Sequence, residues 1–133
     1  MTQSTLDRVK IFHETYGLPV KDAPDITDPM TNNLRVGLLE EEVQELKDAL
    51  ADGDIIEVLD ALTDIQYVLD GAYLSFGLSH LKEAAFAEVQ RSNLSKLGED
   101  GQPIRRLEDG KVMKGPNYSA PDLAQFLEKN KAA

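Results

Sequence analysis

Ten acidic residues lie between positions 40 and 64, against a single lysine. With 3.6 residues per helical turn, Glu42 and Glu45 share one helix face, and so do Asp60 and Asp64. Buried carboxylates without a positive partner are costly, so several that face one core require a cation among them. The chain has no cysteine and two histidines. Oxygen ligands alone are typical of a hard ion, for which Mg²⁺ is the natural choice and Mn²⁺ a substitute.

A helical projection separates the acids that face the core from those that face water. Glu42 and Glu45 fall inside the apolar arc of their helix, and Glu41 lies at its edge. The next helix gathers most of its acids in one narrow stripe, which consists of Glu57, Asp60 and Asp64. We therefore expect metal ligands from both helices, with Glu57 able to join or replace Asp60.

Two interpretations without a catalytic metal stay open. Acidic runs are usually solvated helix faces. Arg35, two turns before Glu42 on the same face, could also pair with one or two of the carboxylates. A further alternative is a non-catalytic helical module whose acidic core binds metal only for stability, or whose broad apolar surface is an oligomer interface.

The elements that must position these acids follow from hydrophobic spacing and capping signals. Helices are expected at residues 4–16, 31–51, 55–76, 79–97 and 121–127. Asp109-Gly110 separates two short β-prone runs, 102–107 and 111–114, which predicts a hairpin. We expect one all-α domain over residues 1–133, a four- to five-helix bundle with a small C-terminal β-hairpin.

Capping residues predict where several of these helices begin and end. Ser79 is expected to cap the fourth helix, and Gly98 to supply its left-handed exit. Pro121 suits the first turn of the last helix. The third helix is apolar on most sides, so it needs more cover than its neighbours give, which predicts a homodimer or homotetramer.

The overall charge restricts the partners that this chain can bind. The 133 residues carry a formal net charge of −10. Acidic surface disfavours both the phosphate backbone of nucleic acid and an anionic membrane. No apolar run is long enough to span a bilayer, and the N-terminus lacks the layout of a signal peptide. We expect a cytoplasmic protein that binds a small molecule.

Three segments, in their order and spacing, resemble the MazG-like all-α nucleoside triphosphate pyrophosphohydrolases. This group includes the dimeric dUTPases and the phosphoribosyl-ATP pyrophosphohydrolases. The segments are Glu41–Leu46, Asp64–Val68 and Arg91–Lys96, and a tail from Asp109 to Tyr118 extends the match. The resemblance covers roughly residues 34–118.

The family pattern is Glu-x-x-Glu followed by Glu-x-x-Asp, with an aromatic residue three positions after the aspartate. Glu42, Glu45 and Asp64 match it directly, and Tyr67 is the aromatic. The remaining glutamate position is Ala61, so this chain departs from the pattern there. Its neighbour Asp60 and then Glu57 are the candidates to replace that ligand.

The resemblance implies attack of water on the α-phosphorus of a nucleoside triphosphate, releasing the monophosphate and pyrophosphate. Positioning and cancellation of charge by Mg²⁺ suit such chemistry. Glu41 is the candidate for the base that accepts the proton of water, with Glu45 shared or alternative. Candidate donors to the triphosphate lie on the fourth helix and on one face of the hairpin's second strand: Arg91, Asn93, Lys96, Lys111 and Lys114.

Two substrates follow from the resemblance. Clearance of unwanted nucleotides is the main expectation, and dUTP is the candidate substrate within it. Phosphoribosyl-ATP of histidine synthesis is the alternative within the same fold.

Overall fold

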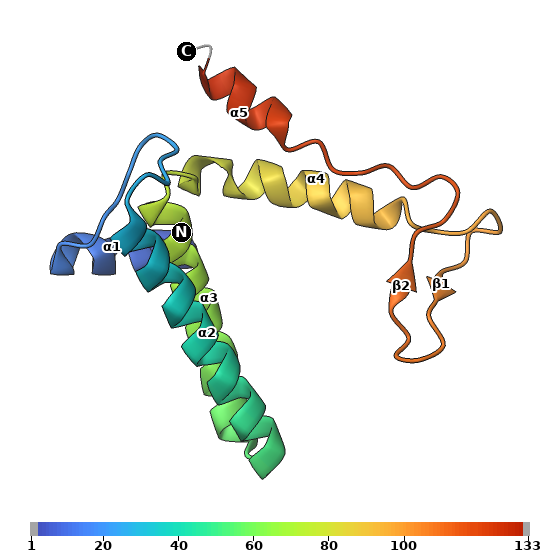
Figure 1. Cartoon of the computed structure of the whole chain (residues 1–133), viewed down its shortest axis with the longest axis horizontal. Helices are drawn as coiled ribbons and strands as arrows, with labels where there is room; N and C mark the ends of the chain where they lie inside the picture. Colours follow the sequence, from blue (N-terminus) through green and yellow to red (C-terminus); the bar gives the residue numbers. More distant parts are fainter. Residues whose placement is uncertain (1–2, 132–133) are drawn as a thin grey trace. The chain divides into compact units, whose positions relative to one another are not determined.

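The computed structural model describes residues 3–131, with side chains described up to residue 127. The regular secondary structure of the described chain is helical apart from one two-stranded antiparallel hairpin, so the all-α class with a small C-terminal hairpin is confirmed (Figure 1). The chain divides between His80 and Leu81 into two compact units. The single domain expected over residues 1–133 stays a prediction.

Helix α1 (Thr5–Tyr16) agrees with the predicted range of residues 4–16 to within one residue. The Ser4 hydroxyl accepts a hydrogen bond from the Asp7 amide at 3.1 Å, and the Asp7 carboxylate accepts one from the Ser4 amide at 3.4 Å. This reciprocal capping box satisfies two amides that the first helical turn leaves without partners. Gly17 then ends the helix with a φ of 69°.

Helix α2 (Pro29–Asp52) begins before the predicted region at residues 31–33. Asp28 is its N-cap, because its carboxylate accepts hydrogen bonds from the Met30 amide at 3.1 Å and the Thr31 hydroxyl at 2.8 Å. Pro29 occupies the first helical position, where its missing amide hydrogen costs nothing. The Asp-Pro pair is therefore the start signal, and the predicted start was wrong.

Helix α3 (Ile55–Ser75) follows after a tight turn. Gly53 adopts a φ of 65°, and the Asp54 carboxylate caps the new helix through the amides of Ile56 and Glu57, both at 3.2 Å. A residue with a Cβ is strained in that left-handed conformation. The turn thus fixes two long helices side by side, running in opposite directions (Figure 1).

The core of the first unit is built on α3, which packs against both α1 and α2. Its buried apolar side chains are mostly small, and they are Val9, Ala49, Ala61, Ala72 and Leu74. Small residues let the backbones of neighbouring helices approach closely. On the edge of this core, the Phe12 ring meets the Tyr67 ring edge-on at 5.7 Å between centroids.

A polar cluster of His13, Arg35 and Gly71 joins the three helices at one level. His13 and Arg35 are 1% and 6% exposed. His13 donates from Nδ1 to the Pro19 carbonyl at 3.0 Å. A Cβ on Gly71 would lie 2.9 Å from His13 Nε2 and closer still to Arg35 Nη1. Position 71 therefore has room for glycine alone.

The second unit contains helix α4 (Lys82–Leu94), preceded by a short 3-10 turn, Ser79–Leu81. The predicted cap by Ser79 was wrong, since Leu81 is the N-cap and makes no side-chain cap hydrogen bond. The predicted end near Leu97 was also wrong. The Ser95 hydroxyl donates to the Ser92 carbonyl at 2.6 Å and accepts from the Ser119 amide at 2.9 Å, so the helix stops where a distant segment binds it.

The two strands of the C-terminal hairpin are shorter than predicted, and the last helix begins later than predicted. Strands β1 (Ile104–Arg105) and β2 (Val112–Met113) pair antiparallel, with Ile104 opposite Met113. Helix α5 (Ala124–Lys131) begins after Pro121 rather than at it. Gly98 does not adopt a positive φ, so it is not the left-handed exit of α4. Among the described residues, no helix is long and apolar enough to cross a membrane.

Replacing Gly71 with alanine should destabilise the first unit by about 1–3 kcal/mol, since the new methyl group forces His13 and Arg35 out of place. Gly37→Ala on α2 is the matched control, because nothing lies within 4 Å of its built Cβ. That change should instead stabilise the helix by about 0.5–1 kcal/mol. Thermal and urea unfolding of both variants measures the two effects. Equal effects of the two substitutions would contradict the steric account.

Candidate metal centre

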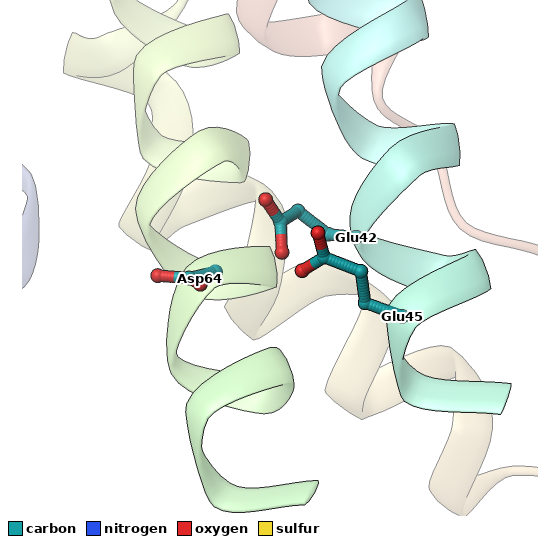
Figure 2. Close-up of side chains that lie close together, drawn as sticks. All are labelled: Glu42, Glu45 and Asp64. Atoms are coloured by element: carbon teal, nitrogen blue, oxygen red, sulfur yellow. The ribbon is translucent and has the colours of Figure 1, made fainter. Parts of the chain in front are cut away.

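Three carboxylates converge from the two long helices of the first unit. Glu42 and Glu45 lie one turn apart on α2, and Asp64 lies on the facing part of α3. One ligand oxygen of each lies within 4.8 Å of the other two. Figure 2 shows the two glutamates reaching from α2 toward the helix that carries Asp64. The structure thus brings together the three residues that match the family pattern directly.

The carboxylates of this cluster raise one another's pKa values. The pKa of Glu42 is raised to about 7, first by burial and then by the neighbouring carboxyl group and charge of Glu45. The charges of Asp64 and Asp60 act on Glu42 in the same direction. Burial also raises the pKa of Asp64, followed by the charges of Asp60 and Glu45. Each carboxylate is therefore harder to ionise because the others are present.

One oxygen of the cluster lacks any partner. Glu42 Oε2 is enclosed by protein and makes no hydrogen bond. No described ion pair neutralises the cluster, and Arg35, which the sequence offered as a partner, forms no salt bridge within the described chain. An enclosed acceptor among like charges fits a bound cation, and an all-oxygen donor set fits a hard one.

The two remaining acids of the predicted stripe occupy different places. Asp60 is exposed, one turn before Asp64, and acts on the pKa of both Glu42 and Asp64. Glu57 is exposed too but contributes to neither shift. Ala61, at the position where the resemblance implies a glutamate ligand, is 1% exposed and has no oxygen to offer.

An open acidic pocket of about 390 Å³ continues from the cluster toward the turn between α2 and α3. Its lining residues are Glu45, Asp48, Ala49, Asp52, Asp54, Glu57 and Asp60. The sequence analysis left Asp48, Asp52 and Asp54 out of the site, although acids flanking a predicted turn were a visible signal. Of the three converging carboxylates, Glu45 is the one that lines this pocket.

Glu41, the predicted base, lies beside Glu42 on α2 with an exposed side chain. Its carboxylate makes no hydrogen bond or ion pair with the rest of the described chain. It is not one of the three converging ligands. The role of Glu41 as the base therefore stays a prediction.

Arg91, a predicted substrate residue, is engaged within the second unit. Its Nε and Nη2 donate to the two Glu88 carboxylate oxygens at 2.8 and 2.9 Å, and Nη2 also donates to the Ala120 carbonyl at 3.2 Å. The same Glu88 carboxylate accepts from the Asp122 amide at 2.7 Å. These bonds tie α4 to the segment that follows the hairpin, which is a structural role.

The other predicted substrate residues also lie in the second unit. Asn93 is exposed on α4, and Lys96 is half-buried just beyond it. Lys111 and Lys114 flank strand β2 rather than belonging to it, so strand alternation does not place them on one face as predicted. Lys114 Nζ lies 4.8 Å from the centroid of the Tyr118 ring. Their contact with substrate stays a prediction.

Fold and site together define an all-α protein with a carboxylate centre between two antiparallel helices. Residues 9–93 match the family model described as phosphoribosyl-ATP pyrophosphohydrolase. This match spans more than half of the chain. The chain belongs to the phosphoribosyl-ATP pyrophosphohydrolase family, within the MazG-like superfamily of all-α nucleoside triphosphate pyrophosphohydrolases, so the resemblance is confirmed.

Two individual proteins are similar to this chain. An uncharacterised protein of Acanthamoeba polyphaga mimivirus is 32% identical over 134 residues, covering 90% of this chain and 52% of the viral protein. This chain therefore spans about half the length of that relative. A solved structure, named as a candidate NTP pyrophosphohydrolase from a species of Exiguobacterium, is 26% identical with a TM-score of 0.46. That similarity covers 99% of this chain and 96% of the other.

The Glu88 carboxylate should make the stability of the second unit depend on pH. Hydrogen bonds from Arg91 and from the Asp122 amide lower its pKa from 4.5 to about 2. A lowered pKa gives stabilisation that is complete above pH 4.5 and is lost as the pH falls toward 2. Glu88→Gln should therefore lower the melting temperature at pH 6 more than at pH 3.

Thermal unfolding followed by circular dichroism at the two pH values measures this difference. Glu83→Gln is the matched control, since Glu83 is an exposed acid on the same helix. Its effect at pH 6 should be smaller than that of Glu88→Gln. If Glu88→Gln also lowers the melting temperature equally at pH 6 and pH 3, the hydrogen-bonded carboxylate does not contribute as described.

Proposed function

We propose that this chain is a divalent-metal-dependent pyrophosphohydrolase that converts a nucleoside triphosphate and water into the monophosphate and pyrophosphate. The enclosed, unpartnered Glu42 Oε2 among converging carboxylates carries the proposal. Membership of the family supports the reaction class. Mg²⁺ is the proposed cofactor, with Mn²⁺ as its substitute, because every donor is an oxygen.

Glu42, Glu45 and Asp64 would hold the cation. When bound, the ion supplies positive charge that offsets the developing charge on phosphate oxygens. The protein's own contribution is to fix the three carboxylates on two rigid helices before substrate arrives. Pre-positioned groups avoid the cost of reorganisation at the moment of reaction.

Glu41 is the proposed general base. Its exposed carboxylate would accept a proton from the water whose oxygen attacks the α-phosphorus. The bond between that phosphorus and the bridging oxygen breaks, and pyrophosphate leaves with the bonding electrons. Glu45 is the alternative acceptor, since it is exposed and lies one turn away on the same helix.

Donors to the triphosphate are proposed from the second unit. Asn93, Lys96, Lys111 and Lys114 carry amide or ammonium groups that suit phosphate oxygens. Arg91 is the weakest member of the predicted set, because Glu88 and the Ala120 carbonyl already use its guanidinium.

Two substrates are proposed for the same chemistry. A deoxynucleotide such as dUTP, removed as an unwanted member of the nucleotide pool, is the first. Phosphoribosyl-ATP is the second, and the description of the matching family model favours it. Both reactions release pyrophosphate, so one assay compares them.

A homodimer or homotetramer is proposed as the working form. Near its start, α3 leaves Ile55, Ile56 and Leu59 exposed at 76%, 74% and 66%. Adjacent apolar side chains in water favour association. Light scattering coupled to gel filtration measures the mass in solution.

Incubation of the full chain with a panel of triphosphates, including dUTP and phosphoribosyl-ATP, should release pyrophosphate in the presence of Mg²⁺. Removal of the metal with a chelator should abolish release, since uncompensated carboxylates would then repel the substrate. A coupled pyrophosphate assay measures the rates. A folded protein that releases none from any substrate would support the non-catalytic helical module instead.

Glu41→Gln should lower the turnover of the best substrate by about 100-fold or more, because it removes the proton acceptor. The neighbouring exposed acid gives the matched control, Glu40→Gln, which should change turnover by less than about twofold. Mn²⁺ binding should be the same in both variants. Equal turnover in the two would exclude Glu41 as the base.

A further inference from the structure

The segment that joins the first two helices, the α1–α2 connector (residues 17–28), is bound to the end of α3 through its backbone. The Lys21 amide donates to the Leu74 carbonyl at 3.0 Å. The Asp25 amide donates to the Phe76 carbonyl at 2.9 Å. A segment without regular structure thus depends on hydrogen bonds to another element for its place.

One carbonyl of the connector accepts hydrogen bonds from side chains of two helices. His13 Nδ1 on α1 donates to the Pro19 oxygen at 3.0 Å, and the Ser75 hydroxyl on α3 donates to the same oxygen at 3.4 Å. Both donor residues are 1% exposed. Because a carbonyl oxygen can only accept, Nδ1 carries the proton of the neutral ring, which leaves Nε2 as an acceptor. The Pro19 carbonyl is therefore the point where α1, α3 and the connector meet.

The other ring nitrogen, His13 Nε2, lies beside a guanidinium. Nε2 and Arg35 Nη1 are both no more than 2.9 Å from the point where a Cβ of Gly71 would stand. Arg35 is 6% exposed and forms no salt bridge within the described residues. Burial lowers the pKa of His13 most, the bond to Pro19 opposes this shift, and the charge of Arg35 adds to it. A proton on Nε2 would place two cations side by side in the protein interior, which is costly.

The buried acid of α3 and the charged pair of the connector are engaged elsewhere. Asp70, which is 0% exposed, accepts a hydrogen bond from the Gln66 side-chain amide at 3.1 Å. Lys21 and Asp25 form an ion pair with each other at 3.1 Å. Arg35 is the charged group that acts on the pKa of the imidazole.

We propose that His13 is an acid-sensitive latch, which holds the α1–α2 connector while its ring is neutral and releases it when Nε2 is protonated. The closed latch requires a neutral ring because Nε2 lies beside the buried Arg35. In the open state the imidazolium is solvated and no longer confined beside the guanidinium. Release of the Pro19 carbonyl also exposes the Lys21 and Asp25 amides, since they belong to the same segment.

The direction of the pH effect follows from proton linkage. An exposed histidine titrates near its ordinary pKa of 6.5, and the pKa of His13 in the closed state is lower. The open state therefore binds the proton more readily. The latch should be fully closed above pH 6.5 and should weaken as the pH falls below that value.

Hydrogen exchange of single backbone amides, followed by NMR on the full chain at pH 7.5 and pH 5.5, tests the latch. The rates are corrected for the intrinsic exchange rate at each pH. In the wild-type chain, protection of the Lys21 and Asp25 amides should fall about five- to tenfold at pH 5.5, since opening then takes up about one proton.

Two variants assign this loss of protection to one ring. His13→Asn keeps a donor for the Pro19 carbonyl but cannot be protonated, so protection of the Lys21 and Asp25 amides should change by less than about twofold between the two pH values. His80 is the only other histidine of the chain, and it is exposed. His80→Asn is therefore the matched control, and it should lose protection as the wild-type chain does.

Glu42 titrates in the same pH range but with the opposite sign. Its pKa is raised to about 7, first by burial, so the folded chain takes up this proton more readily than the unfolded chain does. Protonation of Glu42 therefore stabilises the first unit as the pH falls. It would not produce a loss of protection at pH 5.5.

The imidazole NMR signals of the wild-type chain give a second measurement that needs no variant. His13 should carry its proton on Nδ1 at pH 7.5, and protonation of Nε2 should coincide with the loss of protection at Lys21 and Asp25. Protonation of Nε2 without that loss overturns the proposal. An equal loss in the wild-type chain and His13→Asn, or full protection of the wild-type connector at pH 5.5, also overturns it.

Discussion

Repulsion among the clustered carboxylates is the physical constraint that helix packing in the first unit must overcome. Glu42 and Asp64 each become harder to ionise because of burial and because of their acidic neighbours. Carboxylates on a flexible chain would relieve this repulsion by moving apart in water. They stay together because α2 and α3 are joined by a tight left-handed turn and packed through small residues such as Ala49 and Ala61. Helix packing thus holds a charge arrangement that the acids alone would not adopt.

The close packing of α2 and α3 also explains why the buried apolar side chains are mostly small. Close approach of α2 and α3 requires alanine and glycine at their interface, whereas large side chains would separate the carboxylates. The polar cluster of His13, Arg35 and Gly71 takes one residue from each of three helices. Here too a small residue matters, because Gly71 leaves room for the Arg35 guanidinium. At position 71, the absent side chain provides the space that the His13 and Arg35 side chains occupy.

Much of the site was predictable because it depends on the helical period alone. Spacing placed Glu42, Glu45 and Asp64 on facing stripes, and the structure brings them together. The enclosure of one Glu42 oxygen was not predictable, since it depends on packing. The end of α4 was missed because Ser119, far along the chain, binds Ser95. The start of α2 was missed although Asp28 and Pro29 are a local signal. Contacts between residues far apart in sequence therefore explain some of the missed helix boundaries, but not all of them.

The turn at Gly53 has a consequence for how this chain can change during evolution. Glu42 on α2 faces Asp64 on α3, and Arg35 on α2 contacts the position of Gly71 on α3. On each helix these two positions are seven residues apart, which is about 10.5 Å along the helix axis. A single residue inserted or deleted between position 42 and the turn, or between the turn and position 64, would rotate one helix by about 100° relative to the other and break both matches. Descent should therefore conserve the length of the chain from residue 35 to 71.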